Sequence, residues 1–269
     1  MAAGEQLDLF SVGPGPATQG LPEDKTGRVV ACDTLDEDRL LSAIPDAGIR
    51  ETLALVAEAG RRKLPAAIPV LEALCRRFAG FGADRIVPEQ AAALDALVVI
   101  GGSDVAQTLV RLITKRIVQG PSLRQAVAAA ARLAAKLPPG TIMELLRHDD
   151  PRIRADACRC TRPWPETMPL LHDLLDDLHR DVRKAAACAL GRMGRSEVRA
   201  LLVAYLREEP TAELIDAIAP VADDECVVLL GRLARSTPHL SERVVEALHS
   251  SDHPRAEKII AALRESGPG

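Results

Sequence analysis

A helical hairpin that recurs about every thirty residues constrains this chain more than any other feature of its sequence. Residues 165–193 hold the clearest copy, in which two segments carry apolar side chains at the spacing of amphipathic helices. Arg124, Arg154 and Arg183, each preceded by Leu, Ile or Val, align three copies at offsets of 30 and 29 residues. One such hairpin cannot bury both of its faces alone, so the repetition predicts hairpins stacked into a solenoid.

The clearest hairpin predicts two helices joined by a short turn. Asp181 is available as the N-cap or as a first-turn acid of the second helix, and Gly194 is able to end it. Small residues on the second helix allow close packing on its partner. The two expected apolar stripes are Met168, Leu171, Leu174, Leu175 and Leu178 on the first helix, and Val182, Ala185, Ala186, Ala189, Leu190 and Met193 on the second.

The rest of the chain keeps the same two-helix rhythm with weaker motifs. Only five of the 269 residues are aromatic, and the apolar residues are chiefly Ala and Leu, which favours helices and argues against an all-β fold. We therefore expect an all-α chain of seven or eight hairpins. The further expected helices lie at about 49–60, 65–78, 88–100, 103–118, 195–207, 211–220, 223–236, 239–249 and 253–265.

A family resemblance supports this architecture. Residues 181–191 read D-V-R-K-A-A-A-C-A-L-G and resemble the second-helix signature of HEAT repeats, in the short form also found in bilin-lyase-type repeats. Pro169 and the leucines after it resemble the first helix of the same family. Residues 150–161 match moderately and residues 122–137 weakly. The resemblance implies a right-handed α-solenoid whose inner helices line a concave, partner-binding surface, and it says little about function.

The expected domain organisation has three parts. Residues 1–36 contain a Gly-Pro-Gly-Pro run and scattered acids without an apolar period, so we expect a flexible N-terminal tail. Residues 37–266 form the expected solenoid, and residues 267–269 a C-terminal tail. The six cysteines are scattered, and the N-terminus lacks the pattern of a signal peptide, which together favour reduced thiols in a cytoplasmic protein without a membrane span.

Charge limits the classes of partner. The formal net charge of −4 produces no overall attraction to nucleic acid or anionic lipid, so such contacts would have to be local. Arg154 and Arg183 could form a basic ladder for phosphates, but we expect them to pair with aspartates between repeats, as in HEAT-like arrays. Direct DNA binding along the concave surface ranks third among the functions considered. It would use Arg152, Arg154, Arg180, Arg183, Lys184, Arg192, Arg195 and Arg199, which lie among acids.

The sequence offers little support for catalysis. His172, Asp176 and His179 fall on one flank of the expected first helix, but a water-facing polar flank explains the same residues, so we expect no metal site. The di-iron hydroxylases built on HEAT repeats use paired His-Glu steps, and this chain contains none. We therefore expect no catalytic residue and no cofactor. A bilin-lyase-like or metal-dependent modifying enzyme, or a subunit of one, remains the alternative.

Two short segments outside the expected helices are candidates for a binding role. Trp164 lies in Arg-Pro-Trp-Pro, where it is either an exposed anchor for a partner or, as we favour, a cap on the core between two repeats. Gly101-Gly102-Ser103-Asp104 suggests an anion site at a helix start. The simpler interpretation makes Gly101 the C-cap of one helix and Ser103 the N-cap of the next.

The most informative short segment is Gln-Leu-Asp-Leu-Phe at residues 6–10, because it places large apolar side chains in a tail that has no core. It resembles the peptide by which bacterial polymerases and repair proteins bind the sliding clamp. By that resemblance, Gln6 and Leu7 would contact the clamp groove, Leu9 and Phe10 would fill its apolar pocket, and Asp8 would face outward. The alternative is that Leu9 and Phe10 fold back and cap the first repeat.

Together these features predict a non-catalytic scaffold or adaptor whose partners are proteins. The more specific hypothesis is a bacterial accessory factor of DNA replication or repair, brought to the sliding clamp by the N-terminal peptide. The partner-binding residues expected from the sequence are Gln6, Leu7, Leu9, Phe10 and Trp164.

Overall fold

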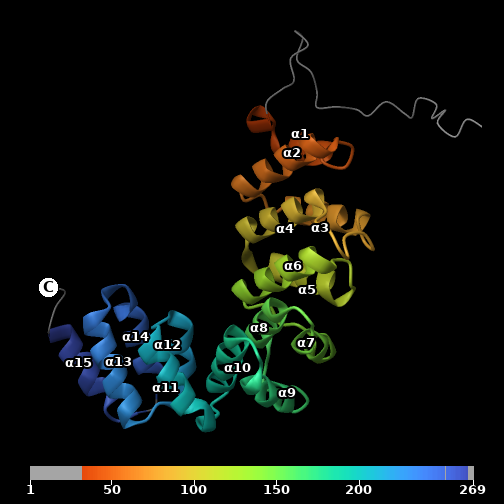
Figure 1. Ribbon diagram of the computed structural model, residues 1–269. Helices are drawn as coiled ribbons and strands as arrows, with labels where there is room; N and C mark the ends of the chain where they lie inside the picture. Colours follow the sequence, from red (N-terminus) through yellow and green to blue (C-terminus); the bar gives the residue numbers. More distant parts are fainter. Residues whose placement is uncertain (1–31, 252, 266–269) are drawn as a thin grey trace, which may run out of the picture.

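The computed structural model describes residues 32–251 and 253–265, and every regular element in them is helical. None of the helices in these ranges combines the length and the hydropathy needed to cross a bilayer. Four short 3₁₀ helices join the α-helices: η1 (Cys32–Thr34), η2 (Leu174–Asp176), η3 (Ser196–Val198) and η4 (Ala219–Val221). The α-helices shown in Figure 1 are α1 (Glu37–Ala43), α2 (Ile49–Arg61), α3 (Ala67–Arg77), α4 (Pro88–Ile100), α5 (Gly102–Thr114), α6 (Gly120–Arg132), α7 (Pro139–Leu146), α8 (Pro151–Cys160), α9 (Met168–Asp173), α10 (Arg180–Arg192), α11 (Arg199–Glu208), α12 (Ala212–Ile218), α13 (Asp224–Ser236), α14 (Pro238–Ser250) and α15 (Ala256–Glu265).

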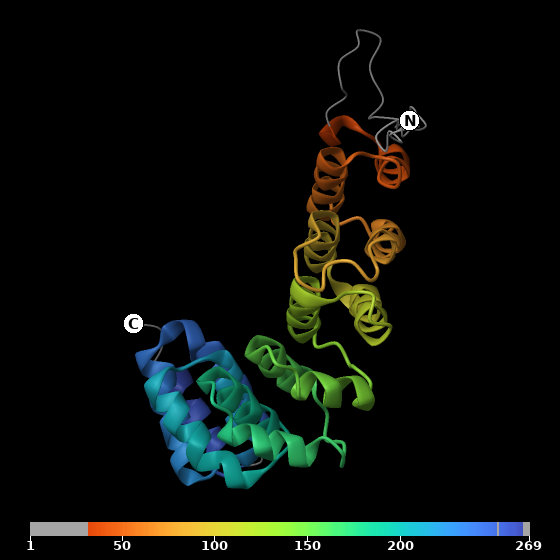
Figure 2. The same ribbon diagram turned by 45° about the vertical axis from the view of Figure 1, so that its right-hand side comes forward.

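Successive helices pair into hairpins, and the hairpins stack into a solenoid. Within the described residues there are seven hairpins, from α1–α2 to α13–α14, followed by the last helix, α15. The even-numbered helices form one continuous row, because each packs on the next from α2 to α14. In the N-terminal half, this row lies on the side that faces the C-terminal half (Figure 2). The expected all-α solenoid of seven or eight hairpins is confirmed.

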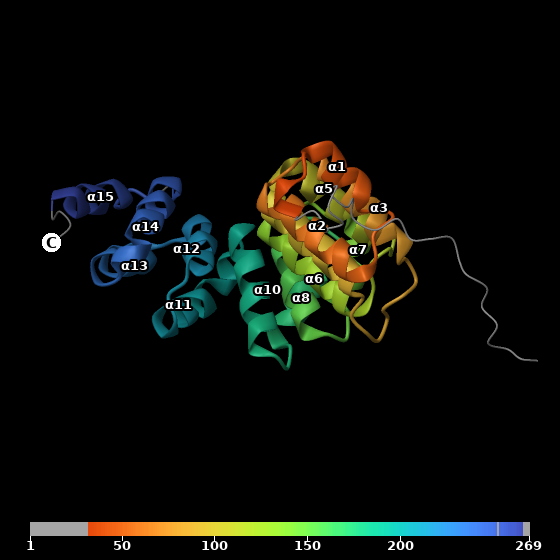
Figure 3. The same cartoon turned by 90° about the horizontal axis from the view of Figure 1, so that it is seen from above.

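The solenoid is bent. Helices α1–α6 stack in one column in Figure 1, and α11–α15 lie beside the lower end of that column. Figure 3, a view along the column, shows α1–α7 overlapping while α11–α15 extend to one side, with α8 and α10 between the two groups. The even-numbered helices of the column therefore line the inner side of the bend. We call the solvent-facing surface of the whole row of even-numbered helices, from α2 to α14, the inner face.

Helix α10 shows how the repeat motif produces this packing. Each residue from Ala185 to Gly191 is buried, because α8 packs on one side of α10 and α12 on the other. Their side chains are mostly one to three atoms long, so the backbones approach closely. Gly194 adopts a φ of +75° after the helix, and the Arg195 N–H donates to the Leu190 carbonyl oxygen at 3.0 Å. The expected helix stop at Gly194 is thus confirmed.

The first helix of this hairpin is shorter than predicted. Helix α9 ends at Asp173, and the short η2 follows it, so His172, Asp176 and His179 do not share one helix flank. Leu178 was expected on the apolar stripe but is 93% exposed. The cause is Asp177, whose carboxylate accepts a 2.8 Å hydrogen bond from the His179 N–H and thereby starts the turn one residue before Leu178.

Other helix boundaries also differ from the predicted ones. Helix α5 ends at Thr114 rather than at residue 118, since Arg116 has a φ of +52° and the chain turns there. The predicted N-cap Ser103 is wrong, because Gly101 serves both as C-cap of α4 and as N-cap of α5. The Ser103 hydroxyl instead donates to the Asp104 carboxylate at 3.4 Å. The helices expected from the sequence do not include α1 and α7.

Candidate partner-binding surface

Polar side chains on the inner face join one even-numbered helix to another. Gln125 of α6 donates from Nε2 to the Asp95 carboxylate of α4 at 2.6 Å and to the Ala91 carbonyl oxygen at 3.1 Å. Further along, Arg243 of α14 donates two hydrogen bonds, of 2.6 and 2.5 Å, to the Asp216 carboxylate of α12. These contacts place polar side chains across the grooves between α4 and α6 and between α12 and α14.

The arginine of the repeat motif has a structural role in two repeats. Arg154 donates two hydrogen bonds, of 2.9 and 3.0 Å, to the Asp177 carboxylate of the next repeat, as expected. Burial alone would raise the pKa of the Asp177 carboxyl, but the hydrogen bonds from Arg154 and from the His179 N–H hold that pKa below its usual range. Arg183 instead donates to the carbonyl oxygens of Asp177 and Leu178, at 2.7 and 3.1 Å. Arg154 is thus paired with an acid of the next repeat, and Arg183 is tied to its own loop through Nη1.

Arg124, which aligns with Arg154 and Arg183, is held much less tightly. Its nearest carboxylate is that of Asp150, and the distance from Nη1 to Oδ2 is 3.8 Å. Unlike Arg154 and Arg183, Arg124 makes no hydrogen bond to a loop carbonyl oxygen within the described residues. In the repeat alignment Gly120 of α6 stands where α8 has its N-cap, Asp150. The loop from α3 approaches Gly120 so closely that a Cβ there would lie 2.1 Å from the Ala83 carbonyl oxygen. An acidic cap cannot occupy this position.

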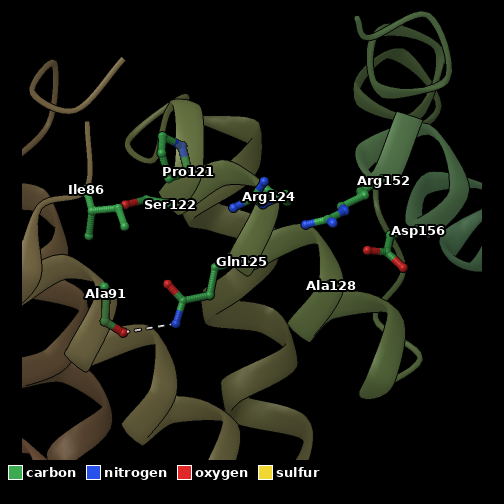
Figure 4. A pocket seen from close by; sticks show the side chains of 9 residues that line it. All are labelled: Ile86, Ala91, Pro121, Ser122, Arg124, Gln125, Ala128, Arg152 and Asp156. Carbon is green, nitrogen blue, oxygen red and sulfur yellow. Dashed lines mark hydrogen bonds between the residues drawn. The ribbon is translucent and has the colours of Figure 1, made fainter. Parts of the chain in front are cut away.

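A pocket of about 390 Å³ opens at this point of the inner face, between α4, α6 and α8. Figure 4 shows the Arg152 side chain extending toward Arg124, with Asp156 beside Arg152 and Ile86 at the opposite end. Arg152 is exposed and forms no ion pair with any residue that the structure describes. Two guanidinium groups thus border one pocket, and only Arg124 has a carboxylate partner, at long range.

Three more polar side chains complete the pocket wall. The Ser122 side chain is 2% exposed, and its hydroxyl oxygen has no hydrogen-bond partner among the described residues. Burial raises the pKa of the Asp156 carboxyl, although Arg159 donates a 2.7 Å hydrogen bond to Asp156 Oδ1 that acts in the opposite direction. Gln125 is already engaged with α4. The remaining lining is apolar: Ile86, Ala91, Pro121 and Ala128.

Of the five residues expected to bind partners, the structure describes Trp164. Gln6, Leu7, Leu9 and Phe10 lie outside the residues that the structure describes. Trp164 is partly buried and packs against the core, and the Thr167 N–H donates to its carbonyl oxygen at 3.1 Å. The role of Trp164, as a cap between two repeats or as an anchor for a partner, stays a prediction.

The groups considered for chemistry are dispersed. Within the described residues, no three His, Cys, Asp or Glu side chains gather where they could hold a metal ion. His172 contacts Glu197, and His179 contacts Asp177, so these histidines point to different partners. Burial raises the pKa of four cysteine thiols to about 12, which keeps them protonated at neutral pH. These are Cys75, Cys158, Cys160 and Cys188.

The basic residues considered for DNA binding are largely paired with acids. Besides Arg154, four of them form ion pairs with acidic side chains of later repeats, so their charge is largely balanced on the protein itself. These pairs are Arg180 with Glu208, Lys184 with Glu209, Arg192 with Glu213 and Arg199 with Asp223.

The chain is similar to a solved structure and, over part of its length, to a family of repeats. The X-ray structure of YibA from Escherichia coli is similar at 13% sequence identity with a TM-score of 0.42, and the alignment covers 81% of this chain and 93% of that one. No curated protein matches the chain. The family model of HEAT repeats matches residues 138–222, which run from the residue before α7 to the residue after η4. The chain is thus an all-helical solenoid whose central part resembles HEAT repeats.

Proposed function

We propose that this protein is a non-catalytic scaffold that holds a protein partner on its inner face. The observation that carries the proposal is the uninterrupted row of even-numbered helices from α2 to α14, whose polar side chains form one extended surface along the bend. Curved solenoids present such surfaces to extended partners.

We further propose that the N-terminal peptide recruits this scaffold to the bacterial sliding clamp, in DNA replication or repair in the cytoplasm. The support is the pentapeptide itself, in which all five residues agree with the clamp-binding motif. Leu9 and Phe10 would fill the apolar pocket of the clamp, with Gln6 and Leu7 along its groove. Because few side chains anchor so short a peptide, we expect micromolar affinity, about −7 to −8 kcal/mol.

Binding of the purified full-length protein to a purified bacterial sliding clamp tests the recruitment. We expect micromolar binding that the Leu9→Ala/Phe10→Ala double variant loses and that the matched Asp8→Ala variant keeps, because Asp8 would face away from the groove. The melting temperature of all three proteins should be equal. Loss of stability in the double variant without clamp binding by the wild type would show that the peptide caps the solenoid, and the recruitment proposal would fail.

A further inference from the structure

We infer that the pocket between α4, α6 and α8 binds a carboxylate side chain of an acidic peptide in the protein partner. This inference rests on the proposed scaffold function and specifies the chemistry of one site on the inner face. It starts from two arginines whose guanidinium groups border the same pocket. Arg152 has no ion pair within the described residues, and Arg124 has only the 3.8 Å contact with Asp150. Two like charges that share a pocket favour a bound anion between them.

Comparison with the other repeats shows that this arrangement is particular to one place in the array. Arg154 and Arg183, which stand at the same repeat position, each donate to loop carbonyl oxygens, with a shortest distance of 2.7 Å. Arg124 makes no comparable hydrogen bond to a loop carbonyl oxygen within the described residues, and its contact is the one with Asp150 at 3.8 Å. The first N–H groups of α6 have no side-chain acceptor, which adds positive potential at the pocket.

Ser122 provides an independent indication that a polar ligand enters the pocket. Its hydroxyl is almost fully buried and unpartnered, although buried hydroxyl groups are nearly always hydrogen-bonded. The Ser122 side chain is part of the pocket wall on the side of Ile86, so a polar group of a bound peptide would supply the missing partner. A carboxylate suits the donors of Arg124 and Arg152, and the Ser122 hydroxyl suits a neighbouring oxygen of the same peptide.

The rest of the wall indicates that the carboxylate belongs to a peptide with apolar residues beside the acid. Ile86 is 63% exposed at one end of the pocket, and Ala91, Pro121 and Ala128 add further apolar surface. Asp156, beside Arg152, disfavours a group with a second negative charge, such as a phosphate dianion, more than it disfavours a carboxylate. An acidic peptide is accordingly the favoured occupant over a phosphopeptide.

Fluorescently labelled seven-residue peptide pools test the inference with the full-length protein. The pools differ only in the central residue, which is Glu, Gln or phosphoserine, and all other positions are mixtures of Ala, Leu, Ser and Gly. We expect the Glu pool to bind at least tenfold more tightly than the Gln pool. That ratio should fall to about one in the Arg124→Gln/Arg152→Gln variant.

A charge-matched control separates this pocket from general electrostatic attraction. The Arg132→Gln/Arg232→Gln variant removes two exposed arginines elsewhere in the array and should keep the tenfold preference. Equal binding of the Glu and Gln pools, a preference that survives in the Arg124/Arg152 variant, absence of binding, or tighter binding of the phosphoserine pool would overturn the inference. If the Glu and Gln pools bound equally well, the scaffold proposal would still stand. The clamp assay depends on residues 6–10 and is independent of this result.

Discussion

The Arg154 guanidinium and the Asp177 carboxylate form a two-point contact that joins α8 to the turn before α10. Both side chains are largely buried, with exposures of 14% and 8%, and Arg154 also donates to the carbonyl oxygens of His148 and Asp149. The Arg154 side chain therefore holds the loop before α8 and the turn before α10 together, which joins two repeats. Removal of one partner would leave the other charge buried without compensation, which is much more costly than loss of an exposed pair.

The Asp177→Ala variant should accordingly lose about 3 kcal/mol of unfolding free energy. The Glu144→Ala variant removes the partner of Arg116 in a pair whose side chains are 72% and 62% exposed, so its loss should stay below about 0.5 kcal/mol. Urea denaturation followed by circular dichroism measures both values. Similar small losses in the two variants would contradict a structural role for the buried pair.

Gly191 should tolerate no side chain. A Cβ at this position would lie 2.5 Å from the Ala217 carbonyl oxygen of α12 and 2.6 Å from the Leu202 side chain of α11. The Gly191→Ala variant should therefore lose about 2 kcal/mol or more, although Ala is the better helix former. Gly140 in α7 has no atom within 4 Å of a built Cβ, so Gly140→Ala should gain about 0.5–1 kcal/mol. Opposite shifts in the melting temperatures of the two variants check both expectations.

Stability should depend on the ionisation of Glu58 at acidic pH. Its carboxylate accepts hydrogen bonds from Arg61 at 2.7 and 2.6 Å and from Arg62 at 2.6 Å, and these bonds lower its pKa from 4.5 to about 2. Because the folded-state pKa is the lower one, the stabilisation is complete above about pH 4.5 and is lost as the pH falls toward 2.

The comparison of the wild type with Glu58→Gln measures this contribution, since the variant cannot ionise. Urea denaturation should show the wild type to be more stable at pH 7, with a difference that is constant down to about pH 5 and shrinks between pH 4.5 and pH 2. A difference that does not change across this range would mean that ionised Glu58 contributes no stability.

The six thiols should differ in reactivity. Cys32 is partly exposed, whereas the other five cysteines are buried. Burial raises the pKa of Cys226 to about 11 and of the others in the core to about 12, so the reactive thiolate is scarce and inaccessible there. A thiol reagent applied to the native protein at pH 7.5 should label Cys32 first, and all six cysteines should react only after denaturation. Mass spectrometry of the labelled peptides identifies the sites, and rapid labelling of Cys158 or Cys188 in the native protein would contradict the packing.

The fold was predictable from the sequence because the spacing of apolar residues indicates which face of each helix is buried. The stripe from Val182 to Leu190 is buried as expected, since a helix that packs on both sides must be apolar or small on those sides. The same spacing wrongly predicted that Leu178 is part of the buried stripe of the preceding helix. Its spacing fits the stripe, but the hydrogen bond from the His179 N–H to Asp177 ends the helical register earlier, and periodicity alone contains no information about that bond.

The pocket was less predictable. The sequence singled out Arg124 only as a repeat position and Arg152 only as one of several basic residues, because their nearness depends on how α6 and α8 stack. In the sequence, Gly120 stands where the next repeat has Asp150, but α10 also lacks an acidic cap and Arg183 is still held by its loop. This difference alone therefore does not identify the pocket.

One contact on the inner face gives the array a mechanical property. Arg159 of α8 donates a 3.0 Å hydrogen bond to Glu213 of α12 and so passes over α10, while Arg192 of α10 reaches the same carboxylate at 3.6 Å. Repeats in a solenoid otherwise act on their nearest neighbours, and small adjustments at each interface add up to a compliant rod. A tie between second neighbours on the inside of the bend resists straightening but permits tighter curling. The array is therefore stiffer in extension than in compression from α8 to α12, and a partner that opens the bend would have to break this tie.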